Sequence, residues 1–137
     1  MILTAPVEKA IAELRLAFPN AQLDVREDGS GGAHVLLDPV DPGSLYTQRE
    51  TWVGFHIPFN YPHADVYPHF IRPDLSREDG RPPINPGMGI QSANWAAWDN
   101  RPVLQLSRRS NRLNPLKDTA TTKLVKVLDW LSKHGGG

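Results

Sequence analysis

Cysteine is absent from this sequence of 137 residues. Disulfide frameworks, thiolate zinc sites, iron–sulfur clusters and cysteine nucleophiles are therefore excluded. Cysteine usage, which normally indicates the redox compartment of a protein, gives no information here. Any catalysis or metal binding by this chain must depend on other side chains.

Neither sign of charge is in excess. Fifteen basic side chains balance fifteen acidic ones, and the sequence pI is near 7.0. Because proteins that bind nucleic acids or anionic membrane surfaces usually carry a basic surplus, we expect neither partner. No apolar run in the sequence approaches the ~18 residues that a membrane span requires. The chain starts without a basic region or a long apolar stretch, so we expect no targeting signal and a cytoplasmic protein.

Glycine and proline, by contrast, are abundant. Eleven glycines and thirteen prolines make up 24 of the 137 residues, whereas the two together average about 12% of residues. A chain of this composition is rich in turns and is not a helix bundle. Its length fits one domain, so we expect a single domain over residues 1–137 with a flexible tail at residues 134–137.

Apolar residues at helical spacing predict one helix at each end of the chain. The first covers residues 5–17, with Thr4 as its cap and Pro6 in its first turn. The second follows Asp118, the expected cap, and carries an apolar stripe of Leu124, Leu128 and Leu131.

Four segments between these helices have the apolar alternation or composition of β-strands. They are residues 21–25, 33–37, 52–57 and 67–71. Their short connections favour an antiparallel meander. Residues 73–102 show no periodicity and predict a long irregular loop. Trp95 and Trp98 in this loop either anchor it to the core or form part of an interface with another protein. The element order therefore predicts an α+β domain with its helices on one face of the sheet.

Two tyrosine–proline motifs lie among these predicted strands. One ends the run Phe55-His56-Ile57-Pro58-Phe59-Asn60-Tyr61-Pro62, and the other begins Tyr67-Pro68-His69-Phe70-Ile71. With the order of elements, they make the chain resemble the ubiquitin-conjugating enzyme (UBC-like) superfamily. It looks most like a bacterial branch with a YP-x-A segment, here Tyr61-Pro62-His63-Ala64, and an SR-R/H motif before the last helix, here Leu106-Ser107-Arg108-Arg109.

This resemblance covers residues 5–131 and implies a UBC-like fold: an N-terminal helix, a four-stranded antiparallel meander, a long active-site-type loop and a C-terminal helix. It also implies a role in a bacterial ubiquitin-like conjugation pathway. The implied partners are a ubiquitin-like protein and an activating-enzyme-like adenylase, with no cofactor, while the oligomeric state is left open.

The chain departs from the superfamily at its catalytic position. Enzymes of the superfamily place a cysteine shortly before a tryptophan–proline pair; if Leu113-Asn114-Pro115 stands in for that pair, the nucleophile position falls near Gln105, with Ser107 two residues on. The family's histidine–proline–asparagine motif is also absent, and Ile84-Asn85-Pro86 is a poor substitute. A thioester carrier is therefore excluded. The chain either carries an acyl group on another residue or binds partners without catalysis.

Ser107 is the main candidate for an acyl carrier. A serine forms an oxyester when a base accepts its proton and a donor stabilises the oxyanion. His63 or His69 is the candidate base, and Arg108 or Asn111 the candidate donor; Ser110 is a second candidate nucleophile. The alternative is that Ser107 only orders the loop before the helix.

Three further features remain open. His56, His63 and His69, with Asp65 or Asp74, are ligand types for zinc, but they match no ligand-spacing rule, so we expect no metal site. The basic run at residues 107–112 is suited to phosphate, to an acidic partner or to a solvated loop. The three glycines at residues 135–137 resemble the end of a ubiquitin-like modifier or terminate the last helix.

Overall fold

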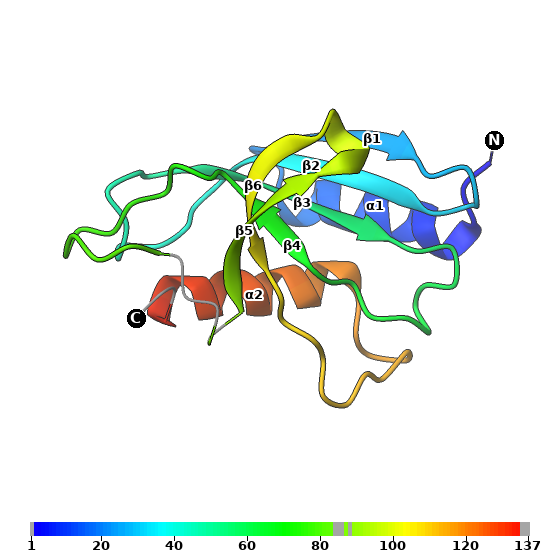
Figure 1. The fold of residues 1–137 in the computed structure, drawn as a ribbon. Helices are drawn as coiled ribbons and strands as arrows, with labels where there is room; N and C mark the ends of the chain where they lie inside the picture. The colour runs from blue at the N-terminus through cyan, green and yellow to red at the C-terminus, as the bar shows by residue number, and fades with distance from the viewer. Residues whose placement is uncertain (1, 84–86, 88, 135–137) are drawn as a thin grey trace.

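The computed structural model describes residues 2–83, 87 and 89–134. Two helices pack on one face of a six-stranded antiparallel sheet with the order β1-β2-β3-β4-β6-β5, which confirms the α+β class (Figure 1). No helix within these ranges is both long enough and apolar enough to cross a membrane. The elements are α1 (Ala5–Ala17), β1 (Gln22–Glu27), β2 (Ala33–Val40), β3 (Thr51–Ile57), β4 (His69–Ile71), β5 (Ile90–Trp95), the 3₁₀ turn η2 (Ala96–Trp98), β6 (Arg101–Leu106) and α2 (Ala120–His134).

Helix α1 has the predicted bounds and the predicted cap. The Thr4 hydroxyl accepts a hydrogen bond from the Val7 amide at 3.4 Å, and Pro6 lies in the first turn, where no backbone donor is needed. Val7 and Leu14, which share one face, are fully buried against the sheet. Local sequence signals therefore account for this helix.

Helix α2 is also confirmed, but its cap differs from the prediction. Thr119 caps the helix: its hydroxyl accepts from the Thr122 amide at 3.0 Å, and the Thr122 hydroxyl accepts from the Thr119 amide at 2.9 Å. Asp118 instead accepts from the Asn114 amide at 2.7 Å and closes the preceding turn. The helix extends through His134, the first residue of the expected flexible tail. Residues 135–137 and Ile84-Asn85-Pro86 lie outside the described residues.

The four predicted strands exist as β1 to β4 and form an antiparallel meander. The prediction of one irregular loop over residues 73–102 is wrong, because residues 90–106 form the hairpin β5–β6. Strand β6 of this hairpin pairs with β4. Strand β5 escapes detection because it is an edge strand with exposed polar side chains between Ile90 and Trp95. The sequence signal for a turn between β5 and β6 is the pair Asp99 and Asn100, because these residue types tolerate the left-handed conformation. They adopt it here, with φ of 61° and 54°.

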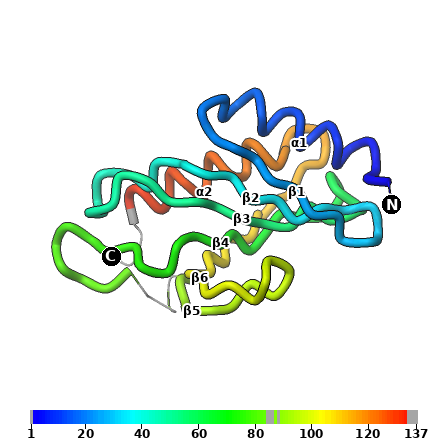
Figure 2. Tube along the Cα trace, turned by 90° about the horizontal axis from the view of Figure 1, so that it is seen from above, coloured from blue at the N-terminus to red at the C-terminus, as the bar shows by residue number. Residues whose placement is uncertain are grey.

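The β5–β6 hairpin curls over the face of the sheet opposite the helices (Figures 1 and 2). Trp95 lies directly on Gly54 of β3, where any Cβ atom would collide with the indole ring. Trp98 is also buried, and Arg26 of β1 stacks on it at 4.2 Å while forming an ion pair with Asp99 at 3.1 Å. The two tryptophans are therefore anchors, as one reading of the sequence predicted.

Candidate functional site

The segment that joins β6 to α2 carries most of the residues that the sequence singles out. Ser107 begins it, and its amide donates to the Gly89 carbonyl at 2.8 Å. The Ser107 hydroxyl accepts a hydrogen bond from the Gln105 side-chain amide at 3.2 Å. An amide donor cannot take a proton from a hydroxyl, so this contact does not activate Ser107 as a nucleophile.

Neither candidate base forms a hydrogen bond with the Ser107 hydroxyl in the described part of the chain. His69 is fully buried on β4, paired in register with Leu106, and its ring packs against Phe55 at 4.9 Å. His63 is exposed in the turn after β3. Both ring nitrogens of His69 lack a hydrogen-bond partner among the described residues. The structure therefore does not bring Ser107, Arg108, His63 and His69 together as one constellation.

Burial governs the protonation of His69. Desolvation, followed by the nearby Lys123 ammonium group, lowers the pKa of His69 from 6.5 to about 3, although Asp65 acts in the opposite direction. The imidazole is therefore neutral at pH 7 and behaves as a core side chain.

Ser110 belongs to a buried polar cluster, which we call the latch, made of Asp65, Ser110 and Lys123. The Ser110 amide and hydroxyl donate to the Asp65 carboxylate at 2.6 and 3.0 Å. Lys123 of α2 donates to both Asp65 oxygens at 3.2 Å and to the Ser110 hydroxyl at 3.0 Å. The Lys123 side chain is only 9% exposed. The latch therefore fixes the basic segment onto α2.

The charge state of the latch follows from these contacts. Burial raises the pKa of Asp65, but the hydrogen bonds from Ser110 and Lys123 outweigh it, so the pKa lies below its ordinary value. A carboxylate of this kind is a weak base, and the Ser110 hydroxyl is already held between an anion and a cation. We interpret Ser110 as an anchor for the segment.

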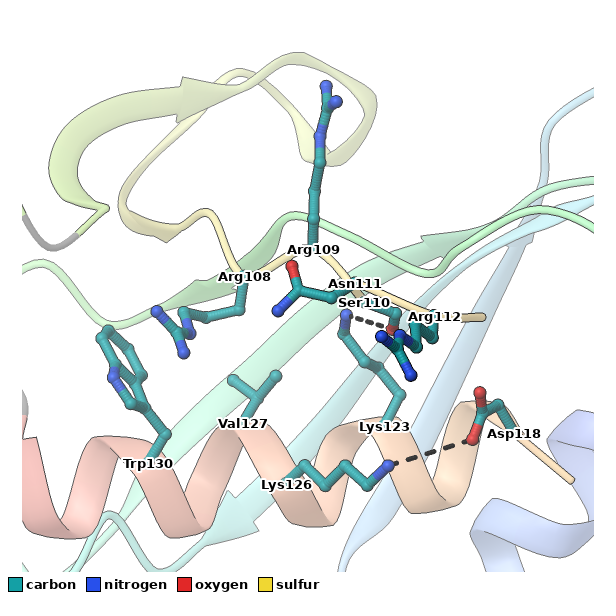
Figure 3. A pocket seen from close by; sticks show the side chains of 10 residues that line it. All are labelled: Arg108, Arg109, Ser110, Asn111, Arg112, Asp118, Lys123, Lys126, Val127 and Trp130. Atoms are coloured by element: carbon teal, nitrogen blue, oxygen red, sulfur yellow. Dashed lines mark hydrogen bonds and ion pairs between the residues drawn. The ribbon is translucent and has the colours of Figure 1, made fainter. Parts of the chain in front are cut away.

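A cleft lies between residues 108–112 and α2, next to the latch (Figure 3). Its volume is about 290 Å³. Arg108 stacks on Trp130 at 4.6 Å, and Arg109 turns away from α2 to stack on Tyr67 at 4.7 Å. The cleft is lined by Arg108, Arg109, Ser110, Asn111, Arg112, Asp118, Lys123, Lys126, Val127 and Trp130. We call this site the arginine cleft.

Sequence reasoning found the arginines of this cleft and missed its helical side. Lys123 looks like a surface residue of an amphipathic helix, and Asp65 was considered only as a metal ligand. The sequence signal for burial of Lys123 is its place at the border of the apolar stripe of α2. Lys123 precedes Leu124 and lies three residues after Ala120, and both of these residues are buried.

The histidines do not converge on a metal. His56 pairs with Asp28, Nε2 to Oδ2 at 2.7 Å, and stacks on His34 at 4.4 Å, whereas His63 and His69 lie elsewhere. Among the described residues, no three histidine, aspartate or glutamate side chains are grouped to hold a metal ion. Burial raises the pKa of Asp28, but hydrogen bonds from His56 and from two backbone amides lower it by a larger amount. The pKa of Asp28 therefore lies below its ordinary value.

A second surface hollow, of about 440 Å³, lies between the start of α1 and the segment before α2. We call it the apolar groove; its apolar lining is Ala5, Pro6, Tyr61, Pro62, Pro115 and Leu116. Leu116 is 94% exposed. The Tyr61 hydroxyl accepts from the Ala120 amide at 3.0 Å, which fixes this wall of the groove to the first residue of α2.

Comparison with known proteins finds no matching family model, no matching curated protein and no matching solved structure.

Proposed function

We propose that the chain is a cysteine-free, UBC-like subunit of a bacterial ubiquitin-like conjugation pathway that binds its partners without carrying an acyl group. The resemblance of residues 5–131 to the superfamily supports the pathway. The order of helix, meander, connecting segment and helix is compatible with it, although the β5–β6 hairpin is an addition to the four-stranded pattern. The partner is a ubiquitin-like protein or an activating-enzyme-like adenylase.

The observation that carries this proposal is the pairing of Ser107 with Gln105 rather than with a base. An oxyester carrier needs a base within hydrogen-bond reach of its hydroxyl, at about 3 Å. A binding subunit needs only a surface. The apolar groove offers one, because Leu116 is nearly fully exposed beside two prolines, and exposed apolar patches mark interaction sites in soluble proteins.

The test combines the chain with the ubiquitin-like protein and adenylase of the bacterium that encodes it, in the presence of ATP. We expect intact-mass spectrometry to find no covalent adduct on the wild type or on Ser107→Ala, and calorimetry to detect binding. Leu116→Asp should weaken this binding about tenfold or more, because a carboxylate placed in an apolar contact loses its hydration without gaining a partner.

Leu16→Asp is the matched control, since Leu16 is 82% exposed on α1 but does not line the groove. An adduct on the wild type that disappears in Ser107→Ala would show that Ser107 is a carrier and overturn the proposal. Failure of both partners to bind the wild type would reject the pathway itself.

A further inference from the structure

The arginine cleft has a charge imbalance that the protein itself does not neutralise. In the described part of the chain, Arg108, Arg109 and Arg112 form no ion pair. Lys126 lies 3.9 Å from Asp118, the one carboxylate that lines the cleft. The protein as a whole has no net charge, so this concentration of cations is local.

We propose that the arginine cleft binds a phosphate group. The cationic groups of Arg108, Arg112 and Lys126 line the same cleft, and an anion placed between them is attracted by all three. Arginine suits phosphate because its planar guanidinium presents two parallel N–H donors to two oxygens. This proposal is independent of the pathway proposed above and uses a different surface from the apolar groove.

The donors surround the cleft from two sides. Figure 3 shows Arg108 and Arg112 reaching toward α2 from the segment above, while Lys126 extends along the helix toward Asp118. A tetrahedral phosphate presents oxygens in several directions and accepts bonds from such an arrangement. A planar carboxylate accepts hydrogen bonds mainly near its own plane, so donors that approach from two sides of the cleft favour phosphate.

The cleft is largely formed before any ligand arrives. The latch holds the backbone at Ser110 through the 2.6 Å bond from its amide to Asp65. Arg108 rests on Trp130, which limits its freedom. Binding therefore loses less conformational entropy than it would on an unanchored loop.

The size of the cleft limits the ligand. A volume of about 290 Å³ lies at the lower end of the range for small-molecule sites, which begins at ~300 Å³. It suits a phosphate monoester with a short attached group, such as a mononucleotide or a phosphorylated side chain. An extended nucleic acid would need a longer basic track than one six-residue segment.

The test measures calorimetric affinity at constant ionic strength for inorganic phosphate, AMP, a phosphoserine peptide and acetate. We expect phosphate compounds to bind more tightly than acetate. Nitrogen-15 NMR shifts should concentrate on the backbone amides of residues 108–112 and 123–130. If AMP binds more tightly than the phosphoserine peptide, the ligand is a nucleotide. If the peptide binds more tightly than AMP, the ligand is a phosphorylated protein. Either result supports the phosphate site.

Arg112→Gln should weaken phosphate binding about tenfold or more, since a hydrogen bond between two charged groups is stronger than one between neutral groups. Arg49→Gln, in the loop before β3, is the matched control, because Arg49 is exposed and does not line the cleft, and it should change the affinity less than about twofold. Both side chains are exposed, so both variants should fold, which thermal melting checks.

Equal losses in the two variants, or acetate binding as tight as phosphate, would indicate diffuse attraction and overturn the proposal. Absence of any shift in the cleft would do the same. Leu116→Asp should leave phosphate binding unchanged, so failure of this site and failure of the proposed partner binding are distinguishable.

Discussion

The Lys123 ammonium group lies 3.2 Å from each carboxylate oxygen of Asp65 and joins α2 to the segment between β3 and β4. Both side chains are mostly buried, with 9% and 17% exposed. In such a pair, the attraction offsets a large desolvation cost, so the loss of one partner leaves the other charge uncompensated.

Lys123→Met should therefore lower the free energy of unfolding by about 3 kcal/mol, because the Asp65 carboxylate keeps its burial and loses its cation. Urea denaturation at pH 7 measures this value. Lys126→Met, at an exposed position on the same helix, is the control and should change stability by less than about 0.5 kcal/mol. Equal effects of the two variants would contradict the role of the latch.

His69 should make the protein less stable in mild acid. Its pKa is about 3 when folded and near 6.5 when unfolded, so below pH 6.5 the unfolded chain binds a proton that the folded chain does not. Stability therefore falls as the pH falls, by about 1.4 kcal/mol per pH unit below the unfolded pKa. From pH 7 to pH 4.5 the contribution of His69 is about 2.5 kcal/mol.

His69→Leu should remove this part of the pH dependence. At pH 7 the variant should be at least as stable as the wild type, because both unpartnered ring nitrogens are replaced by apolar atoms of similar volume. Urea denaturation at pH 7 and pH 4.5 gives both values. His63→Leu, in an exposed turn, is the control, and an equal change in slope in both variants would refute the assignment.

Gly54→Ala should destabilise the protein by about 2 kcal/mol, because the added methyl group collides with the Trp95 ring and a packed core relaxes only partly. In a Trp95→Leu background the same substitution should cost less, since the smaller side chain leaves room. A double-mutant cycle by urea denaturation measures the coupling. Equal costs in both backgrounds would show that the strain has another origin.

Arg26→Met should loosen the tip of the β5–β6 hairpin, because it removes the guanidinium that stacks on Trp98 and bonds Asp99. Hydrogen exchange of the β6 amides near Arg101 should become several-fold faster, and the difference should shrink at high salt because the ion pair with Asp99 is exposed. Lys9→Met on α1, remote from the hairpin, is the control. Unchanged exchange at β6 would contradict the role of Arg26.

Local signals determined which elements were predictable. Helix α1 combines a threonine cap, an early proline and one apolar stripe, and its bounds were correct to the residue. The β5–β6 hairpin has only the turn residues Asp99 and Asn100 as a local signal, because its buried side chains pack against residues far away in sequence. Trp95, for example, packs on Gly54, and neither residue reveals the other.

The same distinction holds for the candidate site. The arginines are adjacent in sequence and were found, but Asp65 and Lys123 are 58 residues apart, and their pairing exists only in the fold. His69 is a different case, because the sequence analysis named it as a candidate base although strand alternation places it on the same face as Ile71. In the structure both side chains are buried, so His69 belongs to the core.

Because β1 and β5 are the outermost strands of the sheet, Arg26 and Asp99 meet only after every strand between them is in place. Closing a contact over 73 residues has a large entropy cost that local contacts do not share. We therefore expect this contact to form after the folding transition state. Its loss should accelerate unfolding and leave the folding rate nearly unchanged, so the hairpin tip extends the lifetime of the folded protein.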